Sequence, residues 1–292
     1  MSADVAQWVE QPLTKRQGAS SNLAVGLLAA LDRFLEAARR TRRERETAGP
    51  ERGLRAAMER WFREQRRVFG ERAGQAVTPG ETPSSSAFDG ALEAALLAGK
   101  PAAAAAAQSA VESALLLGAQ AALADLGDIG LGIAFDLGNP RAVAYLRDKG
   151  AALVTQINET TRQEMRTLIV NMIEERASYD QIAREISRRW AEMAVPKPQG
   201  HIDSRAHLIA VTEVGQAYEQ GNLAAVQDMA SLGLAMEKSW LTVGDDRVSD
   251  GCAENEAAGW IPLDEPFPSG DDRPLRFPGC RCTALYRRVG SG

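Results

Sequence analysis

The sequence predicts an α+β protein whose amino-terminal two-thirds are mostly helical and whose carboxy-terminal third is a small α+β domain. Aromatic residues make up only 5% of the 292 residues while alanine is abundant, a combination that favours helix. Apolar residues recur at helical spacing through residues 91–195. Residues 236–243 and 281–286 instead have the β-branched and aromatic content of strands.

Residues 1–90 predict a helical arm followed by a linker. Asn22 can cap a helix with an apolar stripe, which Gly49-Pro50 should stop or bend. The next amphipathic helix carries five arginines away from its apolar side: Arg55, Arg60, Arg63, Arg66 and Arg67. Residues 73–90 are rich in Gly, Pro and Ser, a composition that is typical of a linker.

The net charge of −5 is unevenly distributed. Residues 39–72 contain twelve Arg against six Glu, whereas residues 237–275 contain ten Asp and Glu against three Lys and Arg. An arginine-rich helix can contact DNA phosphates or an acidic partner. We favour the alternative of a solvated face with Glu–Arg pairs such as Glu59–Arg63, because the six glutamates dilute the positive field.

Residues 91–195 predict a helical domain with recognisable helix starts. Asn139-Pro140 opens one helix, and Ser178 and Gln181 have the spacing of a capping box. The helix after Ser178 should bury an apolar stripe of Ile182, Ile186, Trp190 and Met193. A Pro- and Lys-containing segment at 195–200 then marks the boundary to a third domain, residues 196–292.

Composition also indicates the kind of cellular environment in which the protein is found. We expect no membrane span, because no run of about 18 uninterrupted apolar residues occurs. The amino terminus has no pattern of a secretory signal. Three cysteines, an odd number, indicate a reducing compartment rather than a disulfide scaffold.

The last sixty residues carry the most specific pattern of the chain. About forty residues with many Gly, Pro and Asp and no helical period separate the two expected strands. A loop of this length in a compact domain is usually functional or fastened. The pattern consists, in order, of K-x-W at Lys238 and Trp240, D-D-R-V with Asp245 and Arg247, Cys252, G-W-I-P-L-D-E-P-F-P-S-G from Gly259 through Phe267, and Cys280-Arg281-Cys282.

This ordered set resembles the carboxy-terminal domain of the phage Mu F-like minor head proteins, which are head-morphogenesis proteins of tailed bacteriophages. The similarity is clearest over residues 200–287 and fainter over 139–193. Arg205, Thr212 and Glu213 on the preceding helix are a further shared feature, and Glu213 should meet a basic group such as Arg205, Lys238 or Arg281. The structural motif that the resemblance implies comprises Arg205, Thr212, Glu213, Lys238, Trp240, Asp245, Arg247, Gly259, Phe267 and Arg281.

The resemblance implies a virion structural protein of a phage or prophage that acts in capsid assembly near the portal. Its partners would be portal and capsid proteins, with packaged DNA as a further option. It would be made in the host bacterial cytoplasm and end in the virion. We expect no enzymatic activity, and therefore no catalytic or cofactor-binding residues.

The alternative function is an ADP-ribosyltransferase-like enzyme or a toxin-linked module. The family has been thought distantly similar in fold to these enzymes, and Glu254-Asn255-Glu256 is formally an E-x-E motif. In such enzymes the glutamates lie beside a strand and act with an arginine and a Ser-x-Ser segment. Here the expected position is an acidic loop, and fold likeness alone does not carry function.

Many members of the family carry a zinc-type set of C-x-x-C and H-P-x-C-R-C. In this sequence Ser249 and Phe277 stand at two of those positions, so only Cys252, Cys280 and Cys282 remain. Structural zinc normally takes four ligands, so we expect no cofactor, with zinc as the alternative to buried thiols or one disulfide. We also expect Cys252 to lie close to Cys280 or Cys282 and to fasten the loop 244–279.

Overall fold

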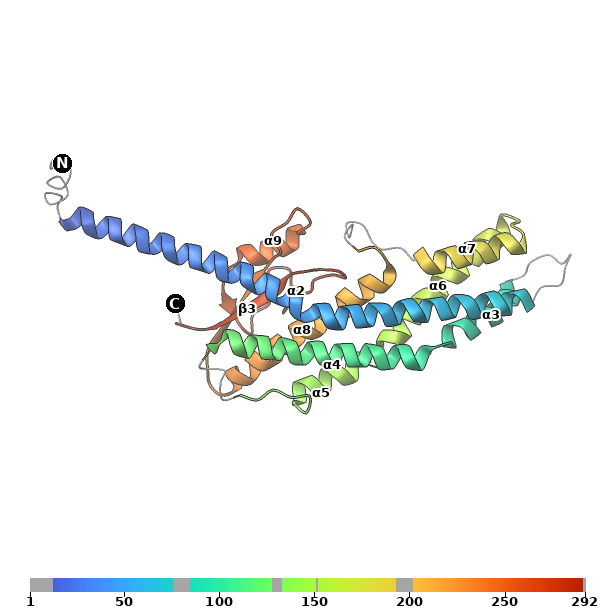
Figure 1. Cartoon of the computed structure of the whole chain (residues 1–292), viewed down its shortest axis with the longest axis horizontal. Coiled ribbons are helices and arrows are strands. Elements are labelled where there is room, and N and C mark those ends of the chain that lie inside the picture. Colours follow the sequence, from blue (N-terminus) through green and yellow to red (C-terminus); the bar gives the residue numbers. More distant parts are fainter. Residues whose placement is uncertain (1–12, 76–84, 128–132, 151, 193–201, 291–292) are drawn as a thin grey trace, which may run out of the picture. The chain divides into compact units, whose positions relative to one another are not determined.

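The computed structural model describes residues 13–75, 85–127, 133–150, 152–192 and 202–290 (Figure 1). The chain divides into two compact units, Met1–Arg45 and Glu46–Gly292. Helix α2 (Leu13–Gln75) begins in the first unit, where Leu31 and Phe34 of the predicted apolar stripe are exposed. The helix that the sequence predicts here is confirmed, but it begins at Leu13 and not after a cap at Asn22.

Helix α2 also continues through Gly49 and Pro50, so the predicted stop at this position is wrong. A proline inside a helix costs about 3 kcal/mol, because it removes one backbone hydrogen bond and crowds the preceding turn. Thr47 and Leu54 lie on either side of Pro50 and are only 2% and 1% exposed. We attribute the continuity of the helix to this packing, which is tertiary and cannot be read from the local sequence.

Ion pairs along α2 differ from the predicted pattern. Glu59 pairs with Arg55 at 3.0 Å and not with Arg63, because Arg55 is also held by Asp203 at 2.8 Å. The opposite face of this part of the helix is apolar and buried, with Leu54, Met58, Trp61, Phe62 and Phe69 in the core. Packing of that face fixes which side of the helix its arginines occupy.

Five further helices complete the helical region: α3 (Ser85–Leu97), α4 (Lys100–Asp125), α5 (Pro140–Gly150), α6 (Ala152–Glu174) and α7 (Tyr179–Glu192). The described part of residues 91–195 is helical apart from short connections, as predicted. The linker prediction is wrong for residues 73–75, which end α2, and for residues 85–90, which belong to α3. Residues 76–84 lie outside the described part.

The predicted helix starts are confirmed by their hydrogen bonds. The Asn139 side chain accepts from the backbone N–H of Arg141 at 2.9 Å. Ser178 donates its backbone N–H to Gln181 at 2.7 Å, and the Ser178 hydroxyl accepts from the Gln181 N–H at 3.4 Å, which is a capping box. Helix α7 buries Ile182, Ile186 and Trp190 as predicted, while Met193 lies outside the described residues.

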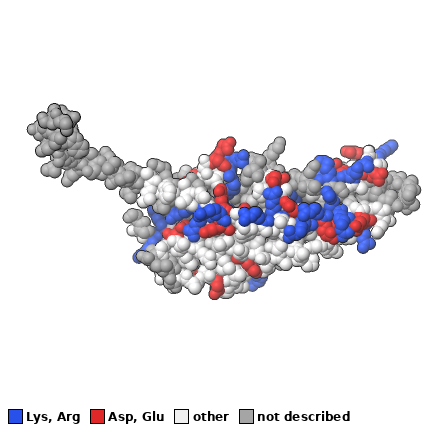
Figure 2. Space-filling view, viewed as in Figure 1, with Lys and Arg blue, Asp and Glu red and all other residues white. Residues whose placement is uncertain are grey.

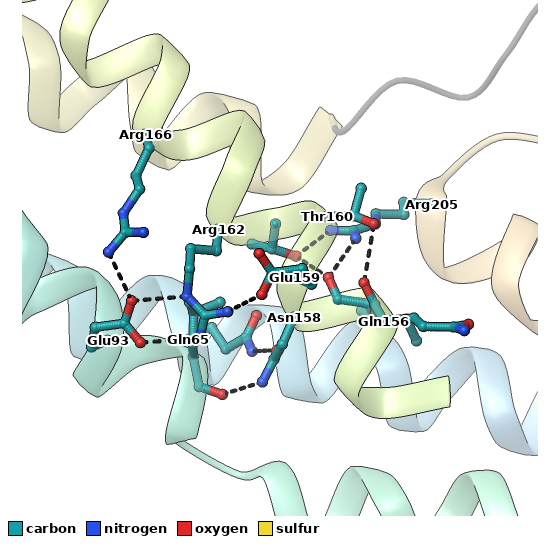
Figure 3. A network of polar contacts seen from close by, with 12 residues as sticks. Gln65, Glu93, Gln156, Asn158, Glu159, Thr160, Arg162, Arg166 and Arg205 are labelled. Carbon is teal, nitrogen blue, oxygen red and sulfur yellow. Dashed lines mark hydrogen bonds and ion pairs between the residues drawn. The ribbon is translucent and has the colours of Figure 1, made fainter. Parts of the chain in front are cut away.

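A buried polar network connects α2, α3 and α6 (Figure 3), and Trp190 joins α7 to it. Gln65 donates to the Asn158 side chain at 3.1 Å and accepts from the Trp190 indole N–H at 3.0 Å. Asn158 in turn donates to the Leu96 carbonyl at 2.7 Å. Because each buried polar group is paired, the network specifies one arrangement of the four helices without leaving an unsatisfied amide.

Helices α4 and α8 (Arg205–Ser231) approach each other closely and pack against each other along most of their length. A methyl group added at Gly118 would lie 1.9 Å from the Tyr218 carbonyl oxygen. One added at Gly221 would lie 1.9 Å from the Leu115 carbonyl oxygen. The two backbones can therefore approach this closely only because both crossing positions are glycine.

The carboxy-terminal region adds a three-stranded antiparallel sheet with the order β2-β1-β3. Strand β1 (Met236–Leu241) pairs with β3 (Thr283–Arg288), with Trp240 opposite Ala284. These two strands confirm the predicted positions. The third strand, β2 (Ile261–Pro262), was not predicted, because two residues are too few to show the alternation of apolar and polar side chains.

The main apolar core draws residues from all three predicted domains, for example Met58, Leu115 and Ala217. The proposed boundaries near 90 and 195 remain a prediction about folding units. Helix α4 is long and apolar enough to cross a membrane by length and composition, a property that buried core helices share.

We predict that Gly221→Ala lowers the free energy of unfolding by about 3 kcal/mol or more, because the new methyl group meets a backbone carbonyl that cannot move aside. Gly70→Ala is the matched control. A methyl group at Gly70 would meet nothing within 4 Å, so this change should be neutral or stabilise α2 by up to about 1 kcal/mol. Chemical denaturation of both variants measures the difference. Equal stabilities would contradict the close crossing.

Candidate functional site around three cysteines

Strand β1 places two motif residues against the loop that follows it. Trp240 is 1% exposed and meets the edge of the Phe267 ring, with ring centroids 5.1 Å apart and planes at 82°. The Lys238 ammonium lies 5.0 Å from the centroid of the same ring and donates to the Asp272 carbonyl at 2.9 Å. Burial lowers the pKa of Lys238, while Asp272 and Asp264 oppose the shift. Phe267 is thus an apolar anchor of the loop.

The side chains of the three cysteines lie close together next to this loop. Cys252 Sγ lies 3.9 Å from Cys280 Sγ, and the sulfur atoms of Cys252, Cys280 and Cys282 all lie within 4.8 Å of one another. All three are buried free thiols. Hydrogen bonds from Cys252 and Cys282 lower the pKa of the Cys280 thiol, and the same contacts raise those of its two neighbours. The predicted contact of Cys252 with Cys280 is confirmed.

The loop between β1 and β3 contains a helix that the sequence analysis missed, α9 (Asp250–Ala257). Ser249 is its N-cap, because the Ser249 hydroxyl accepts from the Cys252 backbone N–H at 3.4 Å. The expectation of a loop without helical structure is therefore wrong over these residues. A serine before an acidic first turn was the available signal, but eight residues rich in Asp, Glu and Gly show no apolar period.

Helix α9 also gives the E-x-E motif a structural role. Glu256 accepts from the Thr242 backbone N–H at 2.9 Å and from its hydroxyl at 2.7 Å, which joins α9 to the end of β1. Asn255 is 0% exposed and exchanges two hydrogen bonds with Ser269, at 2.8 and 3.0 Å. Glu254 is exposed. The two glutamates therefore occupy different environments.

The three motif residues on α8 have separate partners. Arg205 donates to the Thr161 hydroxyl at 2.8 Å and to the Ile157 carbonyl at 3.1 Å, and burial lowers its pKa to about 10. Thr212 accepts from the Gly279 backbone N–H at 3.0 Å, which fastens the end of the loop to α8.

Glu213 lies near a basic group, as expected, but that group is none of the three suggested residues. Burial raises the pKa of Glu213, and the positive charge that opposes this shift is Lys149, not Arg205, Lys238 or Arg281. Lys149 belongs to α5, which packs on α8, so its proximity follows from helix packing and not from sequence spacing.

The remaining motif residues shape the turns of the loop. Asp245 accepts from the Arg247 backbone N–H at 3.1 Å and forms an ion pair with Arg281, which lies between the last two cysteines. The hydrogen bond with Arg281 lowers the pKa of Asp245. Gly259 has a positive φ of 67°, which favours glycine, at the turn between α9 and β2. Arg247 and Arg281 also line a small cavity beside the three cysteines, whereas Gly259 lies in a separate turn.

Glu219 is a buried side chain of the site that the sequence pattern did not single out. It is 0% exposed on α8 and accepts from the Thr283 hydroxyl at 2.7 Å and the Ala284 backbone N–H at 3.0 Å. It lies seven residues after Thr212, so both side chains occupy the same face of α8. A glutamate among apolar neighbours on a helix was the signal that could have identified it.

Comparisons with known proteins assign part of this architecture to a family. Residues 163–285 match the family model described as Phage Mu protein F like protein, a range that includes α8, the sheet and the cysteine cluster. No curated protein and no solved structure matches the chain. The expected distant likeness to ADP-ribosyltransferases therefore has no support from these comparisons.

The match covers less than half of the chain, so it describes this segment and not the whole protein. Residues 163–285 are similar to the Phage Mu protein F like family. The resemblance inferred from the motif set is confirmed, and its fainter part is confirmed from residue 163 onward.

We predict that Glu213→Gln raises the melting temperature by a few degrees at pH 7.5 and has little effect near pH 4. The pKa of Glu213 is raised on folding, so wild-type stability falls as pH rises from the ordinary carboxyl pKa through the raised one. Glutamine stays neutral and avoids this loss. Glu254→Gln on the exposed face of α9 is the control. A gain that does not vary with pH would contradict the assignment.

Proposed function

We propose that the protein is a minor head protein that acts in capsid assembly near the portal. The match of residues 163–285 to a family of phage head proteins carries this proposal. The protein would be made in the host cytoplasm, from a phage or prophage genome, and would remain in the virion with portal and capsid proteins as its partners. The cysteine-centred domain supports a structural role, because its polar side chains hold the loop, α8 and the sheet together.

The proposal predicts that heads purified from the encoding phage contain this chain, and that brief chemical crosslinking joins it to the portal protein. Deleting its gene should reduce the yield of DNA-filled heads, and supplying the full chain in trans should restore the yield. Mass spectrometry of purified heads and of crosslinked products tests whether the chain is present and whether it is joined to the portal protein. Absence of the chain from assembled and assembling heads would contradict the proposal.

We further propose that packaged DNA contacts an arginine face on α2, formed by Arg52, Arg60, Arg63 and Arg66. All four are exposed, and no ion pair joins them to another described residue. The nearby glutamates that could neutralise them are engaged elsewhere: Glu59 with Arg55, and Glu64 and Glu71 with Arg67. The sequence analysis favoured a face neutralised by Glu–Arg pairs, and this division of the pairs is what supports DNA contact instead.

Figure 2 shows Lys and Arg side chains gathered in a band along α2. Arg60, Arg63 and Arg66 are three residues apart and therefore rise about 4.5 Å from one to the next. This spacing is similar to that of the charges along one nucleic-acid strand, which is about 3.4 Å. Arg63 and Arg66 also line a cavity of about 160 Å³ beside Trp190 and Arg205, which gives the face a concave section.

The full chain should bind duplex DNA in a salt-dependent manner. The triple variant Arg60→Gln, Arg63→Gln, Arg66→Gln should reduce the slope of log affinity against log salt by roughly 2–3, because each phosphate contact contributes about 0.9. A control with the same change of charge, Arg147→Gln, Arg184→Gln, Arg288→Gln, replaces exposed arginines outside α2 and should keep the wild-type slope. Fluorescence anisotropy across a salt series measures both. Equal slopes in the two triple variants would contradict the arginine face.

A further inference from the structure

The cavity beside Trp190 is lined by charged side chains that are mostly positive. Arg63 and Arg66 come from α2, and Arg205 comes from the first turn of α8. Glu59 is the one carboxylate among the lining residues, so three guanidinium groups and one carboxylate leave a balance of +2. An anion with close to two negative charges complements such a cavity.

The two arginines on α2 can reach a ligand. Arg63 and Arg66 are both exposed, and in the described part of the chain no ion pair holds either of them. The Glu59 carboxylate accepts from Arg55 at 3.0 Å, so a positive charge from outside the cavity already offsets it. The positive balance of the cavity is therefore open to an anion from solution.

Apolar walls strengthen the attraction between this cavity and an anion. Phe62 and Trp190 line it and are only 8% and 1% exposed. The Arg205 guanidinium donates to the Thr161 hydroxyl and the Ile157 carbonyl, which fixes its position. It lies 5.0 Å from the centroid of the Phe62 ring. Charges attract each other more strongly beside apolar groups than in open water, because the local dielectric constant is lower.

The volume of the cavity, about 160 Å³, limits what can enter it. This space corresponds to about five water molecules at about 30 Å³ each. Pockets for drug-sized ligands are larger, about 300–1,000 Å³, so a whole nucleotide does not fit, whereas a single phosphate group does. A phosphate monoester carries a charge of about −1.5 to −2 at pH 7, and each diester along a strand carries one negative charge. The monoester therefore matches the charge of the cavity as well as its size.

We propose that this cavity binds one phosphate monoester, and that the terminal phosphate of a DNA strand is its ligand. With the DNA contact of the arginine face proposed above as its basis, the cavity distinguishes the end of a strand from the interior. An interior phosphate is a diester with sugars on both sides. A terminal phosphate carries more charge and is joined to a sugar on one side only, so it can enter a concave site.

The test uses the full chain and two short duplexes of the same sequence, one with phosphate and one with hydroxyl at its 5′ ends. We expect the phosphorylated duplex to bind about tenfold more tightly, because it adds hydrogen bonds between charged groups. Fluorescence anisotropy at one fixed salt concentration measures the ratio of the two affinities.

Two double variants of α2 locate the preference. Arg63→Gln with Arg66→Gln removes two cations that line the cavity and should bring the ratio close to one. Arg52→Gln with Arg60→Gln removes the same charge from exposed positions of the same face that do not line the cavity. It should weaken binding of both duplexes and keep the ratio. Equal ratios in the two double variants would overturn the cavity as the site of the preference.

Inorganic phosphate, titrated by calorimetry, separates the site from its source of phosphate. Binding by the wild type that the Arg63→Gln, Arg66→Gln variant loses supports the monoester site. Such binding together with equal affinity for the two duplexes would overturn a strand end as the ligand. Failure to bind inorganic phosphate and to prefer the phosphorylated duplex would overturn the site itself, even where salt-dependent duplex binding persists. Phosphate binding without any duplex binding would instead contradict the proposed DNA contact and leave the site in place.

Discussion

The contact on which the rest of the structure depends is the crossing of α4 and α8 at two glycines. With Gly118 and Gly221 at the crossing, each backbone lies directly against the other, and the alanine-rich surfaces on either side can close. The low content of aromatic residues agrees with this close packing of α4 and α8, because small side chains fill the narrow space between the two helices. The same contact positions the carboxy-terminal sheet, because residues of both helices share an apolar cluster with Met236, Ala284 and Tyr286.

Helix α8 is also the structural link between the helical region and the cysteine-centred domain. Its amino-terminal turn is held to α6 through Arg205. Two turns further along, Thr212 receives the end of the loop, and after two more turns Glu219 receives the start of β3. The domain is thus fastened by backbone N–H groups that donate to α8 side chains. Such hydrogen bonds fix register as well as proximity, because a shift of one residue would leave a buried carboxylate unpaired.

Local signals predicted the parts of the fold that are decided locally. The caps at Asn139 and Ser178 and the strand containing Trp240 depend on nearby residues, and all were predictable. Glu59 shows the limit: Arg55 and Arg63 are both four residues away, and Asp203, far along the chain, positions the one that pairs. Passage of α2 through Pro50 and the proximity of Lys149 to Glu213 were likewise decided by packing. In the candidate site, the sequence predicted that Cys252 meets Cys280 or Cys282 and placed Ser249 at a ligand position, but it did not predict that Ser249 caps a helix.

The glycine crossing has a consequence for biosynthesis. Gly118 and Gly221 are about 100 residues apart, which corresponds to roughly 5–20 s of chain elongation. During that interval α4 has been made but α8, which covers it, has not. The apolar, alanine-rich surface of α4 therefore stays uncovered while the chain is still on the ribosome. The nascent chain is thus exposed to self-association for longer than a fold of neighbouring hairpins would be, and α8 completes the core only late in synthesis.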